Sequence, residues 1–159
     1  MEFWGQAKAC PTIVVLVGLP GSGKSTYLAE LGANAVSSDE IRRLLADDAT
    51  DQRIHRRVFA VVRSLIRHRI EIGRPVTYVD ATNLTRRERR QYIRLGQLYD
   101  CDVEAVFFDV ALEICLERNR LRSRVVPEDA VCEMARRLVA PTVAEGFAKV
   151  TVQHIPMQE

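Results

Sequence analysis

The chain has 159 residues and a mass of 18.0 kDa, with 47% apolar and 28% charged residues. A chain of this length forms about one domain with a substantial core, and its composition excludes disordered and collagen-like proteins. The longest apolar run, residues 13–17, is far shorter than the roughly 20 residues that span a bilayer, and residues 1–10 lack the pattern of a signal peptide. We therefore expect a single cytoplasmic domain over residues 1–159, without membrane contact.

Arginine carries almost all of the positive charge. The formal net charge is only +2, which by itself predicts no polyanionic partner, yet the cations comprise 20 arginines and three lysines. Arginine suits bidentate contacts to phosphate and carboxylate groups, although most of these arginines are expected on solvated helix faces. The four cysteines lack the spacing of a metal site, and we expect them to be reduced, small apolar residues: Cys10, Cys101, Cys115 and Cys132.

Strand and helix patterns alternate along the whole chain. A continuous β-branched apolar run at 12–17 predicts a strand buried on both faces, and a short helix over about 24–31 follows it. Apolar residues at helical spacing predict the longest helix over 53–72, and Thr85 and Glu88 have the spacing of a capping box. The other predicted elements are a strand at 35–36, a helix at 40–45, a strand at 76–79, a helix at 85–99, a strand at 103–110, helices at 112–121 and 127–138, and a strand at 150–152. This alternation predicts an α/β fold with helices on both faces of a parallel sheet.

A phosphate-binding loop lies between the first predicted strand and helix. Residues 18–25 match the pattern G-x-x-x-x-G-K-[ST], in which glycines let backbone N–H groups wrap around phosphates and a helix N-terminus favours the anion. Lys24 can reach the β- and γ-phosphates, and the Ser25 hydroxyl can bind Mg²⁺. The cofactors expected here are ATP, or another nucleoside triphosphate, and Mg²⁺. The residues expected to bind ATP in this loop are Gly18, Leu19, Pro20, Gly21, Ser22, Gly23, Lys24, Ser25 and Thr26.

The acceptor side is expected at the carboxyl edge of the same sheet, where ligands of open α/β sheets bind. Asp39 follows the second predicted strand and can orient and deprotonate an attacking hydroxyl, or it can cap the next helix. Arg42 lies three residues later on the same helix face, where it either holds an anionic acceptor or faces solvent. Asp80 ends the third strand and can position Mg²⁺ through water or hold the loop. Asn83 either contacts substrate or caps the turn, and the structural role is favoured.

Four arginines alternate with other residues late in the chain, and they predict a lid over about 118–127. If the helix continues through them, Arg118 and Arg122 are one turn apart on one face. Arginine from a mobile segment can neutralise the charge that phosphoryl transfer spreads over the equatorial oxygens, and a lid also excludes water. The alternative is a solvated loop rich in arginine. No N-K-x-D guanine signature occurs, and the size favours a small kinase.

The order and spacing of these motifs resemble the polynucleotide 5′-hydroxyl kinase domain of bacterial and phage end-healing enzymes. The resemblance covers residues 12–152 and rests on Gly18–Ser25, on Ser38-Asp39-Glu40-Ile41-Arg42, on Asp80-Ala81-Thr82-Asn83, and on Arg118-Asn119-Arg120 with Arg124-Val125-Val126-Pro127-Glu128. It implies an adenylate-kinase-like P-loop fold of three layers with strand order 2-3-1-4-5. It also implies transfer of the ATP γ-phosphate to the 5′-OH end of DNA or RNA.

The resemblance further implies a division of roles on the acceptor and metal sides. Asp39 would be the general base on the 5′-OH, and Arg42 would grip the phosphate on the 3′ side of the terminal nucleotide. Ser25 would bind Mg²⁺ directly, and Asp39 and Asp80 would reach it through water. From its position after the third predicted strand, and not from the resemblance, Asn83 remains a candidate for substrate binding.

On the nucleotide side, the resemblance implies that Lys24, Arg118 and Arg122 bind ATP and act in catalysis. Arg120 and Arg124 are weaker candidates for the lid. Relatives often carry a phosphatase, ligase or phosphohydrolase domain as well, so the chain is either a stand-alone kinase or one domain of a protein with such domains elsewhere. Two alternatives share the same motifs: a kinase of a small hydroxyl compound such as a sugar, antibiotic or nucleotide-sugar, and a nucleotide-binding module without catalysis.

Overall fold

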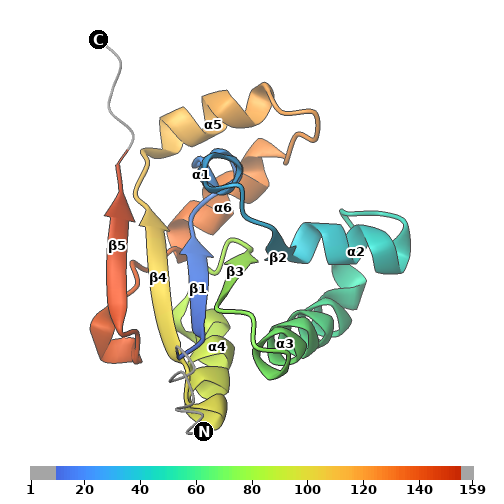
Figure 1. The fold of residues 1–159 in the computed structure, drawn as a ribbon. Coiled ribbons are helices and arrows are strands. Elements are labelled where there is room, and N and C mark those ends of the chain that lie inside the picture. The colour runs from blue at the N-terminus through green and yellow to red at the C-terminus, as the bar shows by residue number, and fades with distance from the viewer. Residues whose placement is uncertain (1–9, 155–159) are drawn as a thin grey trace, which may run out of the picture.

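The fold is organised around a five-stranded parallel sheet (Figure 1). The structure is a computed structural model that describes residues 10–154. The strand order is β2-β3-β1-β4-β5, which confirms the predicted α/β class and strand order. The strands are β1 (Thr12–Val17), β2 (Ala35–Ser37), β3 (Val76–Asp80), β4 (Asp102–Phe108) and β5 (Lys149–Gln153).

Within residues 10–154, six α-helices connect or flank these strands. They are α1 (Lys24–Leu31), α2 (Ser38–Ala46), α3 (His55–Glu71), α4 (Arg86–Tyr99), α5 (Leu112–Arg120) and α6 (Glu128–Arg137), with the short 3₁₀ helices η1 (Gln52–Ile54) and η2 (Val143–Glu145). The predicted elements are all present, and the beginning of the predicted helix over 53–72 forms η1 instead of α-helix. The expected capping box is also present, because the Thr85 hydroxyl accepts from the Glu88 N–H and the Glu88 carboxylate accepts from the Thr85 N–H.

The alternation of β1 side chains explains why this strand is apolar at every position. Ile13, Val15 and Val17 pack into the core beneath α3 and α4, whereas Val14 and Leu16 pack on the opposite face against α1. A strand covered on both faces has no polar side, as expected for a parallel sheet with helices on both faces. Burying each such side chain contributes about 1.5–3 kcal/mol to stability, so β1 forms the centre of the core.

The carboxyl edge of the sheet is where the functional motifs gather. Helices α1, α2 and α4 all begin just after strands, so their N-terminal ends lie at that edge. Helices α5 and α6 follow β4, and α5 packs against the loop before α1, where a Cβ on Gly21 would meet Cys115 and Asn119. A third apolar cluster, which includes Leu19, Leu84 and Cys115 with partly buried residues of α6, joins these helices to the phosphate-binding loop.

The ends of the predicted domain, residues 1–9 and 155–159, lie outside the described residues, and so does most of the segment to which the signal-peptide expectation refers. Among the residues from 10 to 154, none of the helices is both long enough and apolar enough to cross a membrane.

Candidate active site

The loop between β1 and α1 has a backbone that only glycine adopts comfortably. Gly21 and Gly23 have φ of 82° and 103°, in the left-handed region that other residues avoid. A Cβ on Gly21 would lie 2.6 Å from the backbone oxygen of Cys115, so space as well as torsion requires glycine. Gly23 is also the N-cap of α1 and offers no side chain to its first N–H groups. These groups are therefore available to an anion.

Two polar groups in this loop suit a phosphate ligand. The Lys24 ammonium donates to the backbone oxygens of Gly18 and Leu19, at 2.8 and 2.9 Å, which holds it beneath the loop. The Ser22 hydroxyl is buried and has no hydrogen-bond partner within the described chain. Because buried polar groups are normally paired, an unpaired hydroxyl beside an ammonium favours an anionic ligand.

The pKa of Lys24 predicts how nucleotide affinity depends on pH. Desolvation lowers this pKa to about 8, and the nearby Asp80 carboxylate opposes that effect. Lys24 is therefore charged below pH 8 and loses its proton above it, so we expect ATP affinity to fall roughly tenfold between pH 7 and pH 9. Calorimetric titration with ATP measures this. Lys24→Arg, whose charge persists over the same range, should give a flat profile, and a flat profile in the wild type would contradict the assignment.

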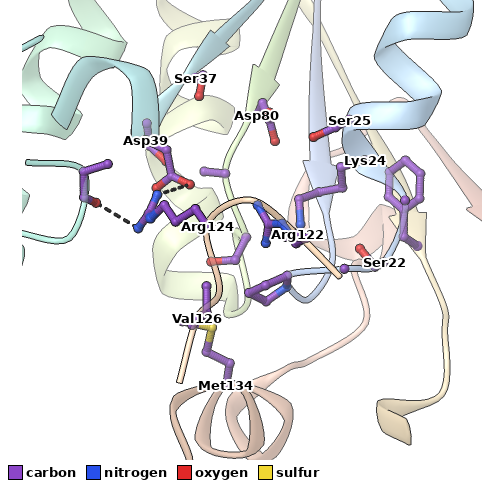
Figure 2. A pocket seen from close by; sticks show the side chains of 18 of the residues that line it. Ser22, Lys24, Ser25, Ser37, Asp39, Asp80, Arg122, Arg124, Val126 and Met134 are labelled. Atoms are coloured by element: carbon purple, nitrogen blue, oxygen red, sulfur yellow. Dashed lines mark hydrogen bonds and ion pairs between the residues drawn. The ribbon is translucent and has the colours of Figure 1, made fainter. Parts of the chain in front are cut away.

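Asp39 lies in the first turn of α2 and faces two arginines. Ser37 caps this helix, since its hydroxyl accepts from the Glu40 N–H at 3.3 Å, so Asp39 is not the cap. One Asp39 oxygen lies 3.3 Å from Arg42 Nη1, and the other lies 3.0 Å from Arg124 Nη1 (Figure 2). Arg124 also donates to the Ala49 oxygen at 2.9 Å, which ties the segment after α5 to the loop after α2.

Arg42 is the buried charged residue of α2, whereas Asp39, Glu40 and Arg43 are exposed. Its side chain is only 6% exposed, and its Nε–H has no hydrogen-bond partner among the described residues. A buried guanidinium normally has all its donors engaged, because leaving one unpaired is costly. Burial excludes the solvent-facing one of the two alternatives for Arg42. Its position beside Asp39 suits a second anion, separate from the one at the phosphate-binding loop.

Asp80 lies between the phosphate-binding loop and Asp39. It is the last residue of β3, paired in register with Ser37 of β2, and its side chain lies near Lys24 and Asp39. Burial raises the pKa of Asp80, Lys24 lowers it, and Asp39 raises it further. In Figure 2, Asp80 and Ser25 lie on the same side of the cavity as Lys24.

These oxygen donors fit Mg²⁺. The Ser25 hydroxyl and the carboxylates of Asp39 and Asp80 all line one cavity. Within the part of the chain that the structure describes, no group of three or more His, Cys, Asp or Glu residues could hold a metal by itself. Mg²⁺ is commonly bound by one or two protein oxygens together with phosphate oxygens and waters, so a small donor set beside a phosphate site suits it.

The cavity is large enough for two substrates. Its volume is about 1370 Å³, against roughly 300–1,000 Å³ for sites of single small ligands. The phosphate-binding loop forms one end, and α2 with the loop after it forms the other. Arg118, Arg122 and Arg124 line it from the segment around the end of α5, and Figure 2 shows Arg122 beside Lys24.

Three of the predicted site residues do not line this cavity. Gly18 and Leu19 lie beneath the loop, where their carbonyls accept from Lys24. Asn83 is 3% exposed, donates to the Leu16 oxygen at 2.8 Å and accepts from the Tyr92 hydroxyl at 2.9 Å. These two hydrogen bonds of the Asn83 side chain connect the loop after β3 to β1 and α4. Of the two roles considered for Asn83, the structure therefore shows the structural one.

The expected helical pairing of the lid arginines is wrong. Helix α5 ends at Arg120, so Arg122 lies in the following turn and does not share a helix face with Arg118. Both still line the cavity. Arg120 does not, because its guanidinium pairs with Glu128 at 2.6 Å on the surface. Arg124 thus contacts the site more closely than Arg120 does.

Sequence reasoning missed the wall formed by η1, α3 and α6. Gln52, His55 and Phe59 line the acceptor end, with the His55 and Phe59 rings 4.7 Å apart, and Met134 and Arg137 of α6 lie in the same wall. The spacing of His55 and Phe59 by one helical turn was a signal that the two rings share a face. Nothing local indicated that this face borders a cavity.

The loop, the partly buried lysine and the carboxylates at the sheet edge define the fold and nucleotide site of the P-loop kinases. The chain belongs to the AAA_33 family, described as an AAA domain, whose family model matches residues 13–141.

Similar proteins include kinases of different acceptors. A bifunctional polynucleotide phosphatase/kinase of Schizosaccharomyces pombe is 27% identical over 143 residues, which are 87% of this chain and 32% of that protein, so the chain spans about a third of this relative. Among solved structures, the Pnkp1/Rnl/Hen1 RNA repair complex has a chain with a TM-score of 0.69 and 19% identity, covering 86% of this chain and 47% of that one. A gluconokinase from Sinorhizobium meliloti 1021 has a TM-score of 0.60 and 17% identity, covering 93% and 85%.

Proposed function

We propose that the protein is an ATP-dependent polynucleotide 5′-hydroxyl kinase. The observation that carries the proposal is Arg42, a buried guanidinium with an unpaired Nε–H beside the carboxylate of Asp39. A sugar acceptor has no anion for such a group, whereas the terminal nucleotide of a strand has a phosphate next to its free hydroxyl. The similarity to a phosphatase/kinase acting on polynucleotides supports the same acceptor.

In the proposed reaction, Asp39 accepts the proton of the 5′-hydroxyl as its oxygen attacks the γ-phosphorus. The bond from the γ-phosphorus to the bridging oxygen breaks, and ADP leaves. Lys24 binds the transferred phosphoryl group, and Arg118 and Arg122 neutralise charge on its oxygens. Mg²⁺, when bound at Ser25 and reached by Asp80 through water, would supply further charge neutralisation.

We further propose that residues 118–127 act as the lid. Arg42 and Arg124 each contact one oxygen of Asp39, so the acceptor hydroxyl competes with them for the carboxylate. The Asp39 side chain is 52% exposed, and exposed ion pairs contribute only about 0–1 kcal/mol. The acceptor can therefore displace Arg124 at little cost.

The direct test uses γ-labelled ATP and Mg²⁺ with 5′-OH oligonucleotides of DNA and RNA, beside a panel of sugars and other small hydroxyl compounds. We expect label on the oligonucleotides. Label only on the small compounds would replace this proposal by a small-molecule kinase. ATP binding without label on any acceptor would leave a nucleotide-binding module.

Replacing Arg42 by alanine tests its proposed contact with the acceptor. We expect the KM for the oligonucleotide to rise on the order of tenfold or more, because charged hydrogen bonds contribute about 1.5–3 kcal/mol, while ATP affinity stays unchanged. Steady-state kinetics with each substrate varied in turn separate the two effects. Arg136→Ala is the matched control, because Arg136 pairs with Glu133 at the surface and does not line the cavity. Equal effects of the two substitutions would contradict the assignment.

A further inference from the structure

The arginines of this chain are concentrated in one stretch, and none of the arginines in that stretch lines the catalytic cavity. Residues 53–94 contain twelve of the 20 arginines but only three of the 21 acidic residues, Glu71, Asp80 and Glu88. The remainder of the chain is therefore net acidic. The near-neutral total of +2 conceals a strongly positive region over α3 and α4.

Helices α3 and α4 lie side by side on the same face of the sheet (Figure 1). Their outer surfaces meet where Arg63 Nη1 donates to the Gln91 side-chain oxygen at 3.0 Å. Arg56 and Arg67 share the helix face of Arg63, because they lie seven residues before it and four after it. On α4, two arginines lie one helical turn to either side of Gln91. We call the five exposed arginines along this line the α3–α4 seam: Arg56, Arg63, Arg67, Arg87 and Arg94.

The seam arginines have no acidic partners. Within the range 10–154, none of the five forms an ion pair, in contrast to Arg43, which pairs with Glu40, and Arg136, which pairs with Glu133. Four other exposed arginines of residues 53–94 likewise have no ion pair in the described chain, but they lie off the line of the seam: Arg57, Arg74, Arg86 and Arg90. The two carboxylates nearest the seam lie toward its ends. Glu88 pairs with Arg137, and Glu71 accepts from the Tyr99 hydroxyl. A row of like charges without counter-charges suits a polyanion better than it suits a merely solvated face.

The seam continues from the acceptor end of the cavity. The first turns of α3 and α4 supply His55, Phe59 and Glu88 to the cavity lining, and both helices run away from it toward the opposite edge of the sheet. From Arg56 to Arg67 the seam is about 16 Å long, at 1.5 Å per residue. At the rise of about 3.4 Å per phosphate of one strand in a B-form duplex, that length matches about five phosphates.

We propose that the α3–α4 seam binds the phosphates of the acceptor strand beyond its terminal nucleotide. This inference rests on the proposed function, because it takes the terminal nucleotide to lie in the cavity beside Asp39 and Arg42. The seam then makes the enzyme favour a strand over a mononucleotide or dinucleotide. The seam contacts phosphates and not bases, so we expect it to bind DNA and RNA strands of any sequence.

The test compares two variants of equal charge change. R63Q/R67Q removes two seam arginines, and R86Q/R90Q removes two exposed arginines from the flank of α4 that faces Ile93 and Glu145. Binding of a fluorescent single-stranded 12-mer is measured by anisotropy across a range of salt concentrations. Because each neutralised phosphate contributes about −0.7 to the slope of log K against log salt, we expect the slope of R63Q/R67Q to be shallower by about 1.4. The slope of R86Q/R90Q should match the wild type.

A kinase assay with a 5′-OH dinucleotide and a 5′-OH 12-mer completes the experiment. We expect R63Q/R67Q to raise the KM of the 12-mer at least tenfold and to leave the KM of the dinucleotide unchanged. Equal slope changes in the two variants, or a wild type that does not bind the 12-mer, would overturn the proposal that the seam binds the acceptor strand. Seam-dependent binding without phosphorylation of any 5′-OH end would instead overturn the proposed function alone. Thermal unfolding of each variant checks that it is folded.

Discussion

Replacing Asp39 by alanine or asparagine is expected to slow phosphoryl transfer by about 10²–10⁴-fold, the usual contribution of a general base. Asparagine keeps the size of the side chain and an acceptor oxygen but cannot take a proton. Asp39 lies in the first turn of α2, on the far side of the cavity from the phosphate-binding loop. ATP binding depends on that loop, so we expect the Kd of ATP to be unchanged in both variants.

Single-turnover transfer from labelled ATP to a 5′-OH oligonucleotide measures the rate, and calorimetry measures ATP binding. Asp129→Asn is the matched control, because Asp129 lies in the first turn of α6, is exposed and does not line the cavity. It should retain the wild-type rate. Full activity of Asp39→Ala would show that the proton leaves by another route. A large loss of ATP affinity would show that Asp39 acts on the nucleotide side instead.

The features that could be predicted from the sequence are those encoded within a few adjacent residues. The apolar run of β1, the phosphate-binding loop and the Thr85 capping box each require a fixed short pattern, and each is present as predicted. Strand order followed from the resemblance to a kinase domain. Residues 18–26 and Asp39 could therefore be placed at the sheet edge from the sequence, and the structure places them there.

The rest of the site depends on contacts between residues distant in the sequence. Asn83 is turned inward by Leu16 and Tyr92, which lie 67 residues before it and nine after it. Arg124 reaches back 75 residues to the carbonyl of Ala49. Helix α5 ends at Arg120 because the chain turns there, with the Asn119 side chain bonded to the backbone of Val126. No local pattern specifies such pairs.

The prediction that most arginines lie on solvated helix faces is also only partly correct. The expectation of solvated arginines holds for Arg136 and Arg120, which are exposed and paired with acidic neighbours. It fails for Arg42 and Arg89, which are buried. A sequence shows how many arginines there are, but not which carboxylates and carbonyls the fold brings to them. Whether an arginine is buried depends on the acceptors that the fold places around it, because only a full set of acceptors offsets the cost of its desolvation.

Arg89 is the clearest case, and its removal is expected to have the largest effect on stability. Its side chain is fully buried, and its Nε and Nη2 donate to the two carboxylate oxygens of Glu145 at 2.9 and 3.0 Å. Its Nη1 donates to the backbone oxygens of Asn83, Leu84 and Val139. Arg89→Met would leave the Glu145 charge buried and unpaired, so we expect the free energy of unfolding to fall by about 3–5 kcal/mol.

Urea denaturation of a double-mutant cycle separates the pair from its surroundings. Because R89M/E145L removes both charges, we expect it to be more stable than Arg89→Met alone, and the difference reports the cost of the unpaired carboxylate. Arg136→Ala breaks an exposed pair and should cost less than about 1 kcal/mol. If Arg89→Met cost no more than Arg136→Ala, the buried pair would not be holding the fold. Arg89 connects the loop after Asp80 to the chain after α6. We therefore expect that, without Arg89, these two segments unfold locally at a lower free energy than the sheet does.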